Sequence, residues 1–138
     1  MIKIKQTKLK DYKEIYNLLK AENMLLNNFT KNKFSKMLRR NRNLYFIATD
    51  NNKVIGSVFV TYDGGNYVYL YKLIVHKNYR NKGIASLLIK KILDKFKQNK
   101  DIWIYCHIHK TNKSSIRVFS KLGFNRRKKH YLFDNSKK

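Results

Sequence analysis

Two cations and a glycine, Arg80, Lys82 and Gly83, lie close together in the chain and are the residues best suited to chemistry. Residues 67–75 before them are almost all aromatic or β-branched, which predicts a strand. Apolar residues after them repeat with the period of one helix face. A turn that opens a helix presents unpaired backbone N–H groups at the positive end of the helix dipole. The pattern therefore predicts an anion site for a phosphate or diphosphate.

Two well-known phosphate-binding motifs are absent from this turn. Gly83 has no glycine five residues before it and no Lys-Ser or Lys-Thr after it, so the GxxxxGK[ST] pattern is missing. The GxGxxG fingerprint of dinucleotide sites is also missing. The remaining pattern is Arg-x-x-Gly-x-Ala, which by itself is also compatible with an ordinary strand–turn–helix connection.

The chain of 138 residues is long enough for one domain with its own core, and we expect a single domain over residues 1–138. Its one cysteine, Cys106, cannot form an internal disulfide, which fits a reducing compartment. The first residues alternate apolar and basic side chains and show no apolar leader, and no run is long enough to span a membrane. We therefore expect a soluble, cytoplasmic protein.

The net charge of +24 arises from 32 Lys and Arg against 8 Asp and Glu. Such a charge favours an anionic partner, for example nucleic acid, the ribosome, an acidic protein or a polyanionic small molecule. The alternative is a coding bias, because Lys, Asn, Ile and Tyr are all abundant and the cations are dispersed along the chain. Both interpretations leave a positive field that attracts anions.

The periodicity of the chain predicts alternating strands and helices throughout. Thr30 is a candidate N-cap for the second helix, and Gly123 is a candidate C-terminal cap for the last helix. The expected strands cover residues 2–6, 44–49, 53–62, 67–75 and 101–108, with a terminal hairpin over 124–133. The expected helices cover residues 10–22, 30–38, 84–96 and 112–122. Strands 67–75 and 101–108, joined by a helix, form a βαβ unit and are therefore parallel.

Two motifs and this element order resemble the GNAT superfamily of N-acetyltransferases. The turn at 80–85 is similar to the family's acetyl-CoA diphosphate loop, usually Arg/Gln-x-x-Gly-x-Gly/Ala. The stretch from Asn112 to Phe124 is similar to its Asn-x-x-Ala-x-x-x-Tyr-x-x-x-Gly-Phe signature. The resemblance covers nearly the whole chain. It implies an α+β fold with a mixed sheet, the order β-α-α-β-β-β-α-β-α-β-β, and central strands that splay apart.

The resemblance also implies a coenzyme site, with acetyl-CoA as cosubstrate and no metal. Backbone groups at the end of strand 67–75 would bond the pantetheine arm like an added strand, and one N–H would polarise the thioester carbonyl. Asn112 would bond the pantetheine, or it is simply a helix N-cap, or both. Phe119 would pack against the pantetheine. The expected coenzyme residues are Leu73, Ile74, Val75, Arg80, Asn81, Lys82, Gly83, Ile84, Ala85, Ser86, Asn112 and Phe119.

The catalytic groups follow from the same resemblance. Counting back from Asn112, the position that often holds a glutamate base in ribosomal-protein acetyltransferases is occupied by His107. A histidine accepts a proton near neutral pH, so His107 is the expected general base, directly or through water; the alternative is a hydrogen-bonded strand histidine. The family's tyrosine acid is replaced by Phe119, which has no hydroxyl. Tyr105, Tyr131 or water would act instead, or the thiolate leaves unaided.

The expected activity is acetyl transfer from acetyl-CoA to a primary amine of a small molecule, peptide or protein. The alternatives are a nucleic-acid- or ribosome-binding protein, using the basic clusters 39–42 and 126–129, and a non-catalytic acetyl-CoA sensor, which Phe119 favours. A homodimer formed through strand edges is a further expectation. The acceptor itself carries no sequence motif.

Overall fold

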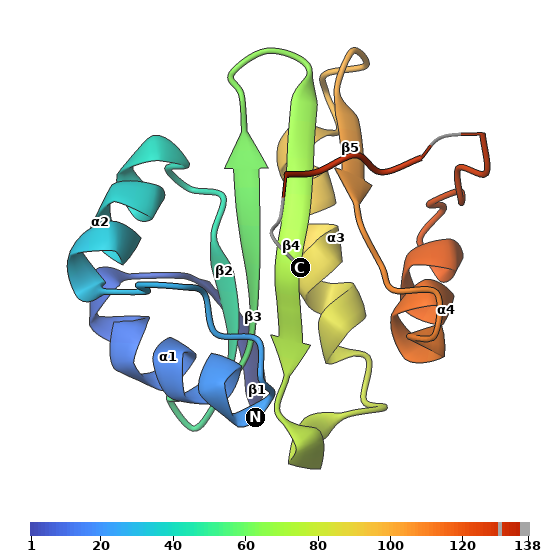
Figure 1. The fold of residues 1–138 in the computed structure, drawn as a ribbon. Helices are drawn as coiled ribbons and strands as arrows, with labels where there is room; N and C mark the ends of the chain where they lie inside the picture. The colour runs from blue at the N-terminus through green and yellow to red at the C-terminus, as the bar shows by residue number, and fades with distance from the viewer. Residues whose placement is uncertain (130, 136–138) are drawn as a thin grey trace.

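The computed structural model describes residues 1–129 and 131–135, and Figure 1 shows the arrangement of its elements. Five strands form one mixed sheet in the order β1-β2-β3-β4-β5, in which β4 and β5 are parallel and the other neighbours antiparallel. The strands are β1 (Ile2–Gln6), β2 (Phe46–Asp50), β3 (Lys53–Tyr62), β4 (Tyr67–Val75) and β5 (Trp103–Cys106). The helices are α1 (Tyr12–Ala21), α2 (Lys31–Arg40), α3 (Ile84–Phe96) and α4 (Lys113–Lys121), with short 3-10 turns η1 (Leu9–Asp11) and η2 (Lys77–Tyr79).

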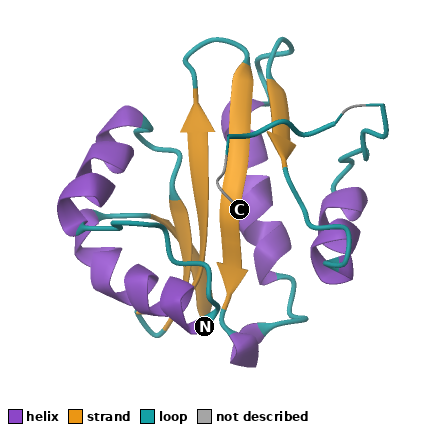
Figure 2. Ribbon diagram, in the orientation of Figure 1, coloured by secondary structure: helices purple, strands orange, loops and turns teal. Residues whose placement is uncertain are grey.

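Helices cover both faces of the centre of the sheet (Figure 2). On one face, rings from the α1–α2 region, Phe29 and Phe34, pack against Phe59 of β3. On the other face, α3 buries Leu88, Ile89 and Ile92 and contacts β2, β3 and β4. The run 54–60 of β3 is therefore buried throughout, as expected for a strand with no solvent-facing side.

The sequence predicted most of these elements. Strands 2–6, 53–62 and 67–75 are confirmed, and so is the mixed α+β class. Thr30 caps α2, because its Oγ1 accepts from the backbone N–H of Lys33 at 3.1 Å. Gly123 has a φ of +91° just after α4, and the N–H of Phe124 reaches the carbonyl of Phe119 at 3.0 Å. This is the left-handed C-terminal cap that favours glycine.

The predicted terminal hairpin over 124–133 is wrong, so the last two strands of the expected order are absent from the described residues. Positions 124–129 and 131–135 contain no strand, and residue 130 lies outside the described residues. The four consecutive cations at 126–129 would repel one another in a tight hairpin turn. Tyr131, Leu132 and Phe133 are exposed, so no apolar face fixes their register.

The predicted strand 101–108 is also shorter in the structure, and the reason lies in β4. Lys72 has a φ of +51°, and the pairing of β3 with β4 shifts register between Ser57 and Phe59. These are the features of a β-bulge, which bends a strand. The parallel ladder between β4 and β5 ends at Leu70 and Cys106, although β4 continues to Val75. The two central strands therefore separate beyond that point, as predicted.

Candidate active site

Beyond Leu70, β4 presents one edge that no strand in the described part of the chain covers. The carbonyl of Ile74 faces β3, because a Cβ on Gly56 would lie 3.3 Å from it. Successive carbonyls of a strand point to opposite sides, so the carbonyl of Val75 faces the edge from which β5 has departed. Of the residues predicted to bond the pantetheine, Leu73, Ile74 and Val75, Val75 presents its carbonyl at this open edge, whereas the carbonyl of Ile74 is directed at β3. A further extended chain of amides can pair there as an added strand.

The predicted phosphate turn connects this edge to α3. Asn81 and Gly83 adopt left-handed conformations with φ of +62° and +76°, which only glycine adopts at little cost. The first bond of the helix runs from the N–H of Leu87 to the carbonyl of Gly83 at 3.1 Å. The N–H groups of Ile84, Ala85 and Ser86 therefore have no acceptor within α3. The structure thus brings a helix end with three N–H groups that have no acceptor within α3, the geometry of an anion site, next to the open edge of β4.

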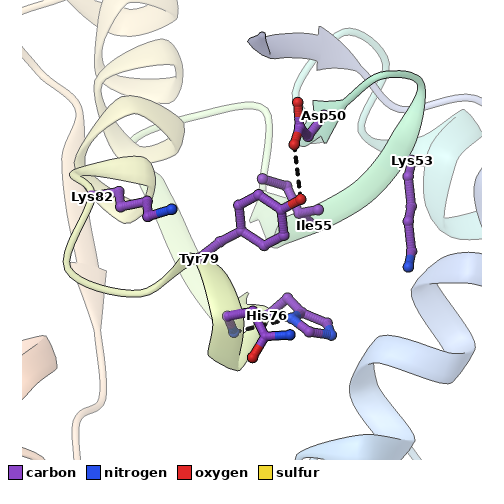
Figure 3. Close-up of a pocket in the computed structure, with 7 residues that line it drawn as sticks. Asp50, Lys53, Ile55, His76, Tyr79 and Lys82 are labelled. Atoms are coloured by element: carbon purple, nitrogen blue, oxygen red, sulfur yellow. Dashed lines mark hydrogen bonds between the residues drawn. The ribbon is translucent and has the colours of Figure 1, made fainter.

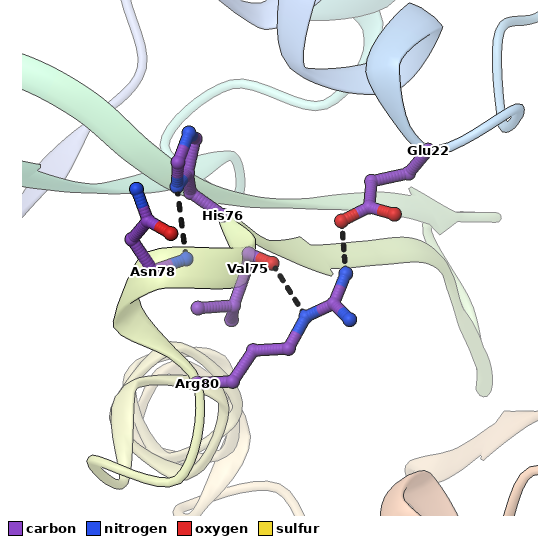
Figure 4. A network of polar contacts seen from close by, with 5 residues as sticks. All are labelled: Glu22, Val75, His76, Asn78 and Arg80. Carbon is purple, nitrogen blue, oxygen red and sulfur yellow. Dashed lines mark hydrogen bonds and ion pairs between the residues drawn. The ribbon is translucent and has the colours of Figure 1, made fainter.

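The side chains of the two cations of the turn, Arg80 and Lys82, contact different partners. The guanidinium of Arg80 pairs with the carboxylate of Glu22, and its Nε donates to the Val75 carbonyl at 3.3 Å (Figure 4). Lys82 instead places its Nζ 5.3 Å from the centre of the Tyr79 ring. The two side chains predicted to bind one diphosphate are therefore engaged with different partners in this structure.

Lys82 belongs to the wall of a cavity of about 430 Å³ beside the turn (Figure 3). The Tyr79 hydroxyl donates to Asp50 Oδ2 at 2.8 Å in this cavity. This bond is the main cause that lowers the pKa of Asp50, and it raises the pKa of Tyr79. The remaining lining residues are Lys53, Ile55, His76 and Asn78. The cavity therefore lies between the turn and the β2–β3 connection, and residues 73–75 do not line it.

His107, the predicted base, is the first residue after β5 and is exposed. Its Nδ1 lies 3.1 Å from the hydroxyl oxygen of Tyr69 on β4. The ring of His107 also contacts Tyr105, with centroids 6.1 Å apart. Its side chain therefore lies on the face of the sheet that carries these tyrosines. The neighbouring His109 is not part of this group, because its Nδ1 accepts from the N–H of Thr111 at 3.2 Å.

His107 stands at one end of a continuous group of rings that the sequence analysis missed. Three rings come from alternate positions of β4 and three from alternate positions along β5 and its extension, so all share one face. The group, here called the aromatic array, comprises Tyr67, Tyr69, Tyr71, Trp103, Tyr105 and His107. Tyr71 packs edge-on against Phe59, which places the array on the α1–α2 face of the sheet. The alternation of aromatic residues in the sequence was the signal that could have found it.

The signature helix α4 positions two further predicted residues. Asn112 is its N-cap, since its Oδ1 accepts from the N–H of Ser115 at 3.1 Å. The helix-capping interpretation of Asn112 is confirmed, and its bond to a pantetheine stays a prediction. Phe119 is 5% exposed and packs edge-on against Phe124 at 5.0 Å between ring centres. Phe119 therefore contributes packing, and its contact with a coenzyme also stays a prediction.

Cys106 lies where the β4–β5 ladder ends, and burial raises the pKa of its thiol to about 11. At neutral pH this group is a thiol and a poor nucleophile. Within residues 1–129 and 131–135, His, Cys, Asp and Glu form no group of three or more that could hold a metal ion. The described helices include none that is long and apolar enough to cross a membrane.

The comparison with protein families agrees with this geometry. The sequence profile of the Acetyltransferase (GNAT) family matches residues 9–124, which is most of the chain. The match includes the phosphate turn, the open edge of β4 and the signature helix α4. The chain belongs to the GNAT acetyltransferase family.

Solved structures share the fold at low sequence identity. The NatC complex bound to Gag peptide and CoA gives a TM-score of 0.77 at 23% identity, covering 92% of this chain and 86% of that chain. The ribosomal-protein-S18-alanine N-acetyltransferase from Escherichia coli gives a TM-score of 0.73 at 17% identity, covering 91% of this chain and 78% of that chain. A probable acetyltransferase from meticillin-resistant Staphylococcus aureus gives a TM-score of 0.79 at 18% identity, covering 100% of both chains.

Proposed function

We propose that this chain is an acetyl-CoA-dependent N-acetyltransferase that moves the acetyl group directly from the thioester to a primary amine. One observation carries the proposal. The ladder between β4 and β5 ends at Leu70 while β4 runs on to Val75, and the exposed edge leads straight to the helix end at Gly83. An arm of amides that ends in a diphosphate fits this succession of an open strand edge and an anion site.

The coenzyme supplies an activated acyl group, and the chain positions it. The backbone at the end of β4 would hold the pantetheine arm through groups that face the open edge, as the Val75 carbonyl does, and one N–H group there would stabilise the oxyanion that forms on the carbonyl. The N–H groups at the start of α3 and the guanidinium of Arg80 would bind the diphosphate. Fixing the thioester in this way also removes much of the entropic cost of the reaction.

The acceptor amine must lose a proton before it attacks the carbonyl carbon. His107 would take that proton, directly or through the Tyr69 hydroxyl, which would pass its own proton to His107 Nδ1 as it receives the proton of the amine. The new C–N bond forms as the C–S bond breaks and the sulfur leaves as a thiolate. Phe119 has no hydroxyl to protonate this thiolate. Water or a hydroxyl of the aromatic array would supply the proton.

Direct transfer is supported by the chemistry of Cys106. A route through an acetylated cysteine needs a thiolate, and burial raises the pKa of Cys106 to about 11. The amine is then the only nucleophile that the proposal requires. Among the similar structures, the NatC complex is bound to Gag peptide and CoA, and the S18-alanine N-acetyltransferase is named for a ribosomal protein. Peptide and protein amines are therefore the first acceptors to test.

Two measurements on the purified protein test the proposal. Calorimetry with acetyl-CoA is expected to show binding, with Gly83→Pro as the variant that removes the helix-opening geometry. Thiol release from acetyl-CoA is then followed with n-butylamine, spermidine and trialanine amide, and mass spectrometry locates the acetyl group on the acceptor. Acetyl-CoA that binds without acetylating any amine would instead favour the sensor alternative, to which Phe119 points. Absence of binding would overturn both.

A further inference from the structure

The aromatic array is a continuous surface of rings that is open to solvent at both ends. Tyr67 and Trp103 are 52% and 48% exposed at one end, and His107 is exposed at the other. The centres of neighbouring rings lie 4.8 to 6.1 Å apart. Single exposed apolar residues are common in soluble proteins, whereas a contiguous exposed group marks an interaction site.

The rings of the array are oriented so that flat molecules can stack against them. Trp103 and Tyr105 on β5 are nearly parallel, with an interplanar angle of 19°. Tyr69 and Tyr71 on β4 are also nearly parallel, with an angle of 7°. A sheet face that carries aromatic rings in this way is a recurrent platform for unpaired nucleic-acid bases, because every base has a flat face that can stack.

The positive charge of the chain is almost wholly uncompensated within the fold. Lys and Arg number 32, against 8 Asp and Glu. In the part of the chain that the structure describes, the ion pairs are Arg80 with Glu22 and the N-terminal amine with Asp50. The other Lys and Arg side chains of this part therefore remain available to an anionic partner.

Exposed lysines flank the half of the array that β5 contributes. Lys100 lies just before this half and Lys110 just after it. Four lysines lie between positions 97 and 113, where Asp101 is the only acidic residue. A chain of phosphates that runs the length of β5 would therefore meet cations at each end while its bases face the rings.

We propose that the aromatic array is a binding surface for single-stranded nucleic acid. Its bases stack on the exposed rings, chiefly Tyr67 and Trp103, and its phosphates pair with the lysines that flank β5. A duplex keeps the faces of its bases inside its own stack, and an acidic peptide offers charge without flat bases. This role goes beyond acetyl transfer and requires no coenzyme.

The test is filter binding of an end-labelled oligonucleotide of about twelve thymidines, a length within the usual site size of such platforms. Acetyl-CoA and amines are left out, because His107 is also the proposed base. Trp103→Leu removes one stacking ring, and the Kd is expected to rise about ten-fold. Tyr131→Leu, which removes an exposed ring outside the array, is expected to leave the Kd unchanged. The same strand paired with its complement is expected to bind about ten-fold more weakly.

The salt dependence of the Kd tests the phosphate contacts separately. For single strands, the logarithm of the Kd rises with the logarithm of the salt concentration by about 0.7 for each neutralised phosphate. A variant that combines Lys100→Gln with Lys110→Gln should therefore lower this slope by about one unit. The control combines Lys90→Gln with Lys91→Gln at exposed positions of α3, which covers the opposite face of the sheet. This control should keep the slope of the wild type.

Tyr67→Leu, on the other strand of the array, is expected to weaken binding in the same way as Trp103→Leu, so a folding defect in one variant does not decide the outcome. Equal Kd values for single strand and duplex, an unchanged Kd in both array variants, or an equal loss in Tyr131→Leu would each overturn the inference. If no oligonucleotide binds and Trp103→Leu raises the KM of a peptide acceptor, the array belongs to the acceptor instead. Each of these outcomes leaves the proposed acetyl transfer standing.

Discussion

His107 Nδ1 lies 3.1 Å from the hydroxyl oxygen of Tyr69. Burial is the main cause that raises the pKa of Tyr69, so this hydroxyl keeps its proton at neutral pH. The contact fixes the ring of His107 against the sheet, and it lets a proton pass between the two groups. Both properties would suit the proposed base, which must meet an amine where β4 and β5 separate.

Removal of the imidazole is expected to lower kcat/KM about 100-fold at neutral pH, the usual contribution of a positioned base. The measurement is the initial rate of thiol release by His107→Ala. Tyr69→Phe keeps the ring and loses the hydroxyl, and its expected loss is smaller, about ten-fold. His109→Ala is the matched control, because that histidine bonds within its own loop. An unchanged kcat/KM in His107→Ala would remove this residue from the mechanism.

Replacement of Gly83 by alanine is expected to strain the turn and to weaken the binding of acetyl-CoA. The φ of Gly83 is +76°, and a left-handed conformation costs a non-glycine residue about 1–2 kcal/mol. Gly123→Ala provides the control, because that residue has a φ of +91° at the C-terminal end of α4. Both variants should unfold at lower temperature, whereas only Gly83→Ala should raise the Kd of acetyl-CoA. Equal Kd values for the two would show that the turn does not contact the coenzyme.

Phe119→Tyr restores the hydroxyl that the family pattern places in this helix, and kcat is expected to stay constant or rise. The residue is 5% exposed and packs on Phe124, so a hydroxyl without a partner would cost about 1–3 kcal/mol of stability. Thermal unfolding and steady-state kinetics on the same preparation separate the two effects. A fall in kcat without loss of stability would argue that the site has adapted to a phenylalanine.

The bond from Tyr79 to Asp50 predicts a pH-dependent contribution to stability. This bond is the main cause that lowers the pKa of Asp50 in the folded state. A carboxyl with a lowered pKa stabilises the fold above its unfolded-state pKa of about 3.9, and this contribution is lost as the pH falls through the folded-state value. Tyr79→Phe should therefore unfold at a lower temperature than wild type at pH 7, and the difference should shrink under acid conditions.

Tyr62→Phe is the control for this effect. The Tyr62 hydroxyl donates to the carbonyl of Gly65 at 3.2 Å, and a carbonyl does not titrate. Its stability difference from wild type should be similar at pH 7 and at acid pH. A Tyr79→Phe difference that persists undiminished at low pH would mean that the Asp50 charge is not involved.

The sequence was sufficient for the elements whose signals are local. The alternation in β1, the apolar run of β3, the N-cap at Thr30 and the glycine after α4 each depend on neighbours in the chain. The predicted phosphate turn and the signature helix α4 could be placed along the chain for the same reason, because each is marked by a local motif. The secondary structure of these elements follows from the residue pattern and the turn chemistry alone.

The features that the sequence could not give depend on contacts between distant segments. The pairing of Arg80 with Glu22 joins positions 58 residues apart, and nothing in the local pattern of either residue indicates it. The early end of β5 follows from the bulge at Lys72 in another strand. The predicted hairpin over 124–133 is wrong because Tyr131 and Phe133, in its second expected strand, are 90% exposed and no core covers them. Strand propensity without such burial does not fix a strand.

Trp103 is the only tryptophan of the chain and lies 48% exposed at the end of the aromatic array opposite His107. Its indole stacks on Tyr105 at 4.8 Å and meets Tyr67 on β4 at 5.6 Å. The protein consequently carries an intrinsic fluorophore on this face of the sheet. A molecule that covers the face will alter the emission of that fluorophore, so an unmodified sample can report its own encounters.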